Sequence, residues 1–251
     1  MRRLFTFGCS FTQYWRWPTW ADILGREYDL FKNWGICGGG NCQILYNLME
    51  CHRRHRIAPG DTVGIMWTGV SREDRYVRDH WLEGGNVYWG SELGEDYVRR
   101  FACERGYLMR DLAVISAVQE LLDTWGCESR MMSMVPLDQD TSTNQLGKDP
   151  TGSKGLADVL DLYQPVFSRI SPSVFEITFG SKWYTGDGIP DSFDPKRRDF
   201  HPTPAEHLAY LDQVWPAQQI SHHTRDWVVR IEQQLRERKQ LEWTPALPTR
   251  L

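Results

Sequence analysis

The chain has 251 residues and a formal net charge of −4 at pH 7, with 41% hydrophobic and 25% charged residues. That balance is typical of a folded globular protein and argues against a disordered chain. The mild acidity argues against general nucleic-acid binding, which usually requires a basic surface. The unusual number is 12 tryptophans. So many tryptophan side chains indicate either an aromatic core or a surface that binds a flat ligand such as a sugar.

The sequence predicts a cytoplasmic protein that does not associate with membranes. No apolar stretch approaches the ~20 residues that a membrane-spanning helix requires. The basic residues at positions 2 and 3 precede an apolar run that is too short for a signal peptide. The 6 cysteines form no C-x-x-C pair and are interpreted as free thiols. A virion-associated protein, or one released by lysis, would share these features. No metal or cofactor is expected, and the oligomeric state stays open.

Predicted strands and helices alternate along the chain. Strands are expected at 3–7, 28–34, 62–67 and 129–135, and helices at 17–24, 107–125, 156–163, 204–214 and 223–239. A further helix should begin at Asn41, acting as its N-cap, and end near residue 56. This order predicts an α/β fold, a three-layer α/β/α sandwich with a central, mostly parallel sheet, formed by a single domain over 1–251. Residues 70–105 are interpreted as an insertion and 240–251 as an irregular tail.

Ligands of such sheets bind at the carboxyl ends of the strands, so the loops at 8–15, 35–41 and 68–72 should converge. The first loop contains Ser10, which becomes a nucleophile when a neighbouring base takes its proton. The alternative is that Ser10 only caps a helix. Cys9 beside it is either a thiol nucleophile or inert packing.

Two further segments carry chemistry. The glycines at 38–40 precede a helix, where their amide N–H groups can point at a developing negative charge; a flexible turn is the plainer interpretation. Asp199 and His201 lie two residues apart in a loop that opens a helix. Such a pair suits a general base oriented by a carboxylate, although a single histidine is more often structural.

Together these blocks resemble SGNH (GDSL-type) hydrolases, in the form seen in bacterial and phage members. The resemblance covers most of the chain and rests on four segments: Gly8-Cys9-Ser10-Phe11-Thr12 as the GDS block, 17–24 as the first helix, 33–41 as the glycine block, and Asp199 with His201-Pro202-Thr203-Pro204 and His207 as the C-terminal block. It implies the flavodoxin-like SGNH fold. It also implies Ser10 as nucleophile, His201 as base and Asp199 as the carboxylate that orients it. The N–H groups of Ser10 and Gly38, with Gly39 as second choice, would donate to the oxyanion.

The sequence departs from the family pattern in two places. The family places its aspartate three residues before the histidine, where this chain has Arg198. The acid is therefore either Asp199 or one of three others: Asp187, Asp191 and Asp194. The family also expects Gly-x-Asn after the third strand. Here the missing donor would be replaced by the Thr68 hydroxyl, or else by Ser71 or Arg72.

The resemblance implies a serine esterase that hydrolyses carboxylic esters, with a small molecule or a glycan carrying O-acetyl groups as substrate. Trp15, Trp89 and Trp183 are expected to contact that substrate. Two alternatives remain open. One is a binding or structural protein with this fold and little or no catalysis. The other is an acyltransferase on the same scaffold.

Overall fold

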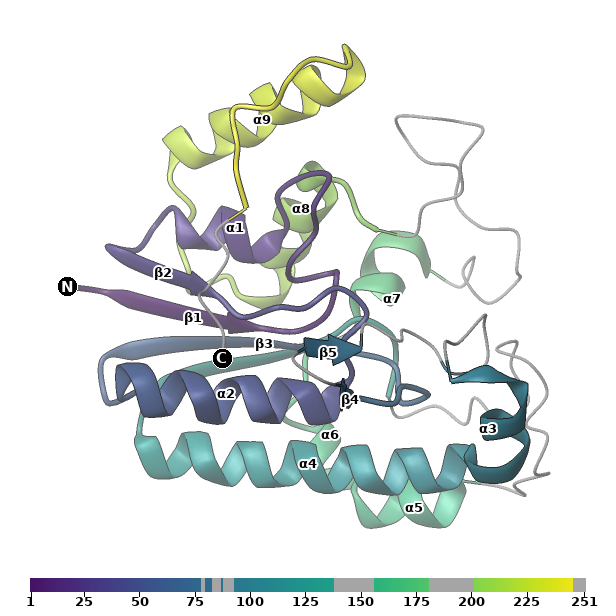
Figure 1. Cartoon of the computed structure of the whole chain (residues 1–251). Coiled ribbons are helices and arrows are strands. Elements are labelled where there is room, and N and C mark those ends of the chain that lie inside the picture. Colours follow the sequence, from purple (N-terminus) through teal and green to yellow (C-terminus); the bar gives the residue numbers. More distant parts are fainter. Residues whose placement is uncertain (78–79, 83–86, 88–92, 138–155, 181–200, 246–251) are drawn as a thin grey trace.

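The computed structural model describes residues 1–77, 80–82, 87, 93–137, 156–180 and 201–245, and its centre is a parallel sheet (Figure 1). The four strands are β1 (Arg3–Phe7), β2 (Leu30–Asn33), β3 (Asp61–Trp67) and β6 (Glu128–Ser133). They are all parallel, in the order β2-β1-β3-β6. This is the flavodoxin-like strand order, so the predicted α/β class is confirmed.

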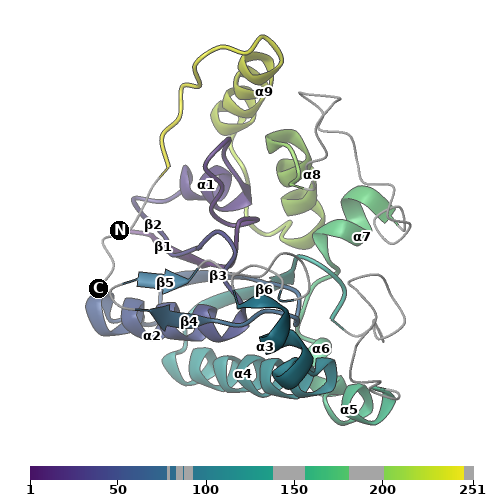
Figure 2. The same ribbon diagram turned by 45° about the vertical axis from the view of Figure 1, so that its right-hand side comes forward.

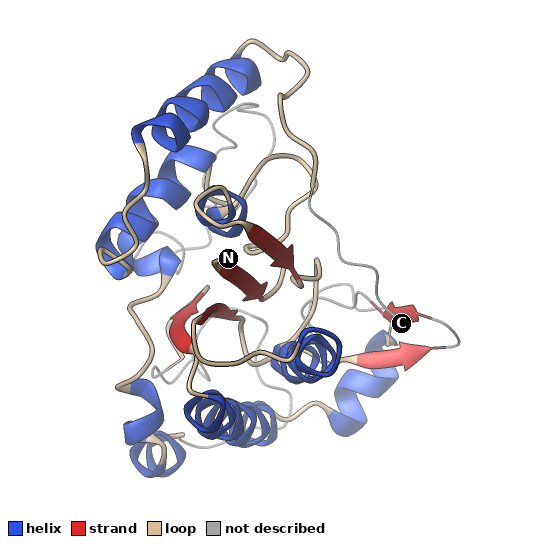
Figure 3. Cartoon of the chain, turned by 90° about the vertical axis from the view of Figure 1, so that its left-hand side faces the viewer, coloured by secondary structure: helices blue, strands red, loops and turns tan. Residues whose placement is uncertain are grey.

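Helices cover both faces of the sheet, as the view along the strands shows (Figure 3). One face carries α1 (Trp20–Gly25), α8 (Pro204–Val214) and α9 (His222–Arg236). The other carries α2 (Asn41–His55) and α4 (Glu104–Trp125), with α5 (Ala157–Leu162) and α6 (Gln164–Phe167) packed on α4. Helix α7 (Val174–Phe179) packs against α8. The short α6 and α7 have no counterpart among the predicted elements.

Strand β3 lies at the centre of the core, and all of its residues are buried. Gly64 in this strand faces the indole of Trp20, and a Cβ at position 64 would lie 2.8 Å from that ring. The absence of a side chain at position 64 therefore lets the indole of Trp20, the first residue of α1, pack directly against β3. Trp20, Trp34 and Trp67 are fully or almost fully buried. Much of the tryptophan excess thus belongs to the core.

The start of α2 corrects one prediction. Its N-cap is Gly40, while Asn41 is the first helical residue and does not cap the helix. The first-turn amides of Gly40 and Gln43 instead donate to the carboxylate of Asp74, at 2.7 and 2.9 Å. A carboxylate from another part of the chain satisfies these orphan donors and suits the positive end of the helix dipole.

The side chain of Asn41 is used for a tertiary contact. Its Oδ1 accepts from the Thr68 amide at 2.9 Å, and its Nδ2 donates to the Thr68 carbonyl at 3.0 Å and to Asp111 at 2.8 Å. Asn41 therefore ties α2 to the end of β3 and to α4. Burial raises the pKa of Asp111 to about 6, and the neighbouring Arg110 opposes that shift.

The segment interpreted as an insertion forms a small antiparallel hairpin and a helix. These are β4 (Arg75–Val77), β5 (His80–Leu82) and α3 (Gly94–Phe101). The hairpin lies beside α2 (Figure 2) because Trp81 stacks on Tyr46 of α2, with ring centroids 5.3 Å apart, and meets the Tyr76 ring edge-on at 5.4 Å. No helix within the described residues is both long and apolar enough to cross a membrane.

Candidate active site

The loops after β1 and β2 meet at the carboxyl edge of the sheet, as expected. The Ile36 amide donates to the Gly8 carbonyl at 2.9 Å, and Asn33 Nδ2 donates to the Thr12 carbonyl at 2.8 Å. The loop after β6 joins β3 through a bond from the Met134 amide to the Trp67 carbonyl, at 2.7 Å. The ends of all four strands therefore border one region.

Ser10 occupies the tight turn that follows β1. The amides of Thr12 and Gln13 both donate to the Cys9 carbonyl, which closes this turn. Gly8 precedes it, and a Cβ there would lie 2.1 Å from Thr12 Oγ1 and 2.9 Å from the Met66 carbonyl oxygen. Only glycine fits where the chain leaves the strand so sharply. The turn holds Ser10 at the strand end, 6% exposed.

The structure brings Ser10 and His201 together. Ser10 Oγ lies 2.8 Å from His201 Nε2, although the two residues are 191 positions apart in the sequence. This distance lies within the hydrogen-bond reach that a general base needs to take a hydroxyl proton. The structure thus brings the predicted nucleophile and the predicted base together, while their catalytic roles stay a prediction.

The backbone that follows His201 is held on both sides. Helix α8 begins with Pro204 at its first turn, and Thr203 and Glu206 form a reciprocal capping box. Trp17 Nε1 donates to the Pro202 carbonyl at 2.8 Å, and the Trp17 side chain is buried. The histidine is therefore attached to a rigid helix start and to the loop that carries Ser10.

Two aromatic rings contact the imidazole of His201. Tyr14 stacks on it with ring centroids 4.0 Å apart and an interplanar angle of 12°, and Phe11 lies at 4.8 Å. Trp17 meets the Tyr14 ring edge-on at 4.8 Å. We call Phe11, Tyr14 and Trp17 the aromatic bracket. Within it, the Phe11 and Tyr14 rings restrict the orientation of the imidazole, and Trp17 supports the Tyr14 ring.

Hydrogen bonding within the glycine loop distinguishes Gly38 from Gly39 as candidate oxyanion donors. The Gly39 amide donates to the Ile36 carbonyl at 3.0 Å, and the Gly40 amide is taken by Asp74. Within the described residues, the amides of Ser10 and Gly38 have no hydrogen-bond partner. Gly38 is therefore the better candidate of the two, and the oxyanion role of Ser10 and Gly38 stays a prediction.

Thr68 is fully buried, with its amide bonded to Asn41 and its hydroxyl 4.0 Å from Met134 Sδ. Its use as an oxyanion donor stays a prediction. Cys9 is also fully buried, and its thiol lies 3.8 Å from the same Met134 sulfur. That position suits the packing interpretation of Cys9.

Of the remaining residues predicted to contact substrate or to orient His201, the structure describes only Trp15. Trp15 is 66% exposed, its ring lies 5.8 Å from that of Tyr14, and its contact with substrate stays a prediction. The others lie outside the described residues, and their roles also stay predictions: Trp89, Trp183, Asp187, Asp191, Asp194 and Asp199.

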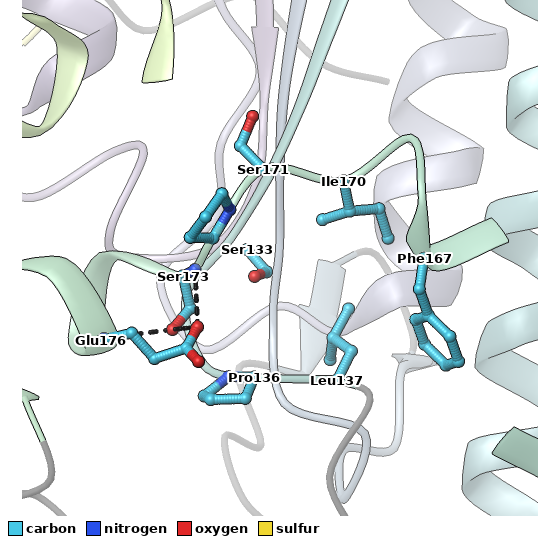
Figure 4. Close-up of a pocket in the computed structure, with 9 residues that line it drawn as sticks. Ser133, Pro136, Leu137, Phe167, Ile170, Ser171, Ser173 and Glu176 are labelled. Atoms are coloured by element: carbon cyan, nitrogen blue, oxygen red, sulfur yellow. Dashed lines mark hydrogen bonds between the residues drawn. The ribbon is translucent and has the colours of Figure 1, made fainter. Parts of the chain in front are cut away.

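A cavity of about 200 Å³ opens at the carboxyl end of β6, between this strand and α7 (Figure 4). Its polar lining comes from Ser133, Ser171, Ser173 and Glu176, and Ser173 Oγ donates to Glu176 at 2.7 Å. None of the predicted site residues is among the described residues that line it. Helix α7, which forms one wall of this cavity, contacts the site through Phe175. The centroid of the Phe175 ring lies 5.4 Å from that of Phe11.

A second histidine lies close to the site. His207 on α8 is fully buried, and neither of its ring nitrogens has a hydrogen-bond partner within the described residues. Burial lowers the pKa of His207 to about 3, and the charge of nearby His201 acts in the same direction. His207 is therefore a neutral core residue at physiological pH, which is the structural interpretation of a single histidine.

His207 should make the fold sensitive to acid. Between pH 6.5 and 3, the unfolded chain binds a proton that the folded chain excludes, so stability falls as pH falls. The expected loss from this group between pH 7 and pH 5 is about 2 kcal/mol. Urea unfolding at both pH values should show His207→Leu losing about 2 kcal/mol less than the wild type over this interval. Equal losses in the two proteins would contradict a neutral buried His207.

The comparisons with known proteins return solved structures only. The chain aligns with a member of the lipolytic protein G-D-S-L family from Veillonella parvula, at 14% identity and a TM-score of 0.46, over 86% of this chain and 99% of that one. It aligns with a GDSL-like lipase from Bacteroides thetaiotaomicron at 13% identity and a TM-score of 0.46, over 86% of each chain. No family model and no curated protein matches.

Proposed function

We propose that this protein is a serine hydrolase that cleaves carboxylic esters. The observation that carries the proposal is the 2.8 Å approach of Ser10 Oγ to His201 Nε2. His201 takes the Oγ proton as Oγ bonds to the ester carbonyl carbon, and the Ser10 and Gly38 amides donate to the resulting oxyanion. The ester C–O bond then breaks, and the leaving alcohol takes the proton from His201. His201 then takes a proton from water as the water oxygen bonds to the acyl carbon. The bond from the acyl carbon to Ser10 Oγ breaks, Oγ takes the proton back from His201, and the carboxylic acid is released.

Within this proposal, Asp199 orients the imidazole and holds the tautomer that presents a lone pair at Nε2. The aromatic bracket supports that orientation through the Tyr14 stack. The proposed substrate is a small ester or an O-acetylated glycan. Trp15 supports the glycan, because an exposed indole offers a flat face to a sugar ring.

Covalent labelling tests the proposal directly. A fluorophosphonate probe should form one adduct, on Ser10, because the probe reacts with activated serine hydroxyls and mimics the acyl step. Mass spectrometry of the digested protein should locate the adduct. It should be absent in Ser10→Ala, strongly reduced in His201→Ala and retained in Cys9→Ala.

Labelling also separates the rival functions. An unlabelled wild-type protein would favour the binding or structural alternative, and an adduct on Cys9 would move the nucleophile to the thiol. An acyltransferase would label at Ser10 as well. It would differ by releasing its acyl group to an added alcohol faster than to water.

A further inference from the structure

The cavity at the carboxyl end of β6 lies apart from the residues of the proposed reaction, none of which is among the described residues that line it. Its volume is about 200 Å³. Since a cavity of ~150 Å³ already holds a molecule the size of benzene, this one has room for a single six-membered ring with substituents. Ser133 and Leu137 in its lining are buried, whereas Pro172 and Glu176 are exposed. The cavity therefore leads from the surface to the end of β6.

The outer wall of the cavity is held in place by hydrogen bonds. Ile170 forms a parallel bridge with Met131 of β6, and the Ser171 amide donates to the Met131 carbonyl at 2.9 Å. The buried Tyr210 of α8 donates its hydroxyl to the Pro172 carbonyl at 2.8 Å. The wall is therefore fixed along the edge of the sheet, as the walls of preformed ligand sites are.

One side of the cavity presents polar groups that the fold leaves unused (Figure 4). Ser133 is 3% exposed, and its hydroxyl has no hydrogen-bond partner within the described residues. Glu176 accepts from the amide and the hydroxyl of Ser173 with one carboxylate oxygen, Oε2, at 2.9 and 2.7 Å. Its Oε1 accepts from no group in the described part of the chain. An unpaired buried hydroxyl costs free energy, and a ligand that bonds to it removes that cost.

The opposite side of the cavity is apolar. Three hydrophobic side chains lie there, across from the polar ones in Figure 4: Leu137, Phe167 and Ile170. A linear acyl chain would contact these side chains but leave Ser133 and Glu176 without partners. A pyranose ring meets both sides, because its C–H faces pack on apolar and aromatic side chains while the hydroxyls at its edge donate and accept hydrogen bonds.

We propose that this cavity binds one pyranose unit of a carbohydrate. The ring hydroxyls bond to Ser133 Oγ and Glu176 Oε1, and one face of the ring packs against Phe167. The proposal goes beyond the proposed hydrolysis and does not depend on it, because it uses neither Ser10 nor His201.

Calorimetry with neutral methyl pyranosides tests the proposal. The probes are the methyl β-glycosides of glucose, galactose and N-acetylglucosamine, with 1-hexanol as the apolar probe. At least one pyranoside should bind the wild type at a single site. Ser133→Ala should weaken that binding about 3- to 10-fold, the effect of one neutral hydrogen bond. Glu176→Gln should weaken it about 10-fold or more, because a hydrogen bond to a charged acceptor is stronger.

Two controls separate recognition from folding. Glutamine at the third position of a helix also forms a capping box, so Glu176→Gln keeps the start of α7. Asp212→Asn makes the same chemical change at an aspartate of α8 that pairs with Arg225 on the surface. Its affinity for the pyranoside should equal that of the wild type.

Ser10→Ala, which lacks the proposed nucleophile, should also bind with wild-type affinity. The proposal is overturned if no pyranoside binds, if Ser133→Ala and Glu176→Gln both bind as the wild type does, or if Ser10→Ala loses binding. Binding of 1-hexanol alone would make the cavity an alkyl pocket and also contradict the proposal. If a pyranoside binds as expected while Ser10 is not labelled by the fluorophosphonate, the proposed function fails and the carbohydrate site stands.

Discussion

Ser10→Ala is expected to lower kcat for p-nitrophenyl acetate by about 10³-fold or more, the size seen when a serine nucleophile is removed. His201→Ala should cause a loss of similar size, because the hydroxyl of Ser10 is a weak nucleophile without a base at 2.8 Å. The double variant should be no slower than either single variant, since each residue acts only through the other. Steady-state release of p-nitrophenol measures all three.

Ser168→Ala is the matched control for this comparison. Ser168 lies on the surface, and its hydroxyl donates only to the neighbouring Pro165 carbonyl, at 2.7 Å. Its rate should equal that of the wild type. If Ser10→Ala keeps the wild-type rate, the nucleophile is a different group. If the losses of the two single variants multiply in the double variant, Ser10 and His201 do not act as a unit.

Asn41→Leu is expected to reduce the free energy of unfolding by about 3–5 kcal/mol, the largest effect on stability that we predict. The substitution removes all three hydrogen bonds of the Asn41 side chain, two to the Thr68 backbone and one to Asp111. Both of these partners are fully buried, so their polar groups would lose their partner without gaining water. Equilibrium unfolding in urea measures the loss.

Asn47→Leu provides the comparison, because Asn47 lies on the same helix and is also buried. Its Nδ2 makes one hydrogen bond, to the Trp34 carbonyl at 2.9 Å. The expected loss is about 1–2 kcal/mol, the value for a single unmet buried group. Equal losses in the two variants would show that Asn41 is an ordinary buried amide and not the tie between β3 and α4.

The sequence was sufficient to predict the sheet because its strands have clear local patterns. β1 agrees residue for residue with the predicted strand, and β3 was predicted as a buried strand to within one residue. Ser10 and His201 could be singled out because each lies in a recognisable block next to a strand end or a helix start. The structure brings the two side chains to 2.8 Å from each other, and their catalytic roles stay a prediction. The short α6 and α7 were missed, since a helix of four to six residues shows too little of the 3.6-residue period.

Contacts made across the fold were harder to predict. Asn41 has the residue type of a helix cap, but its tertiary contacts with Thr68 and Asp111 take precedence over that local preference. Phe11 and Tyr14 were missed as neighbours of His201 because they lie in an irregular loop, where no period shows which way a side chain points. Their signal was the density of aromatic residues directly after Ser10.

The distance of 191 positions between Ser10 and His201 has a consequence for biosynthesis. A ribosome adds Ser10 to the chain 191 residues before it adds His201. Until α8 packs against α1 and the Pro202 carbonyl meets Trp17, the serine has no partner to take its proton. The serine of the nascent protein is therefore not activated, and the proposed chemistry begins only when Ser10 and His201 are brought together.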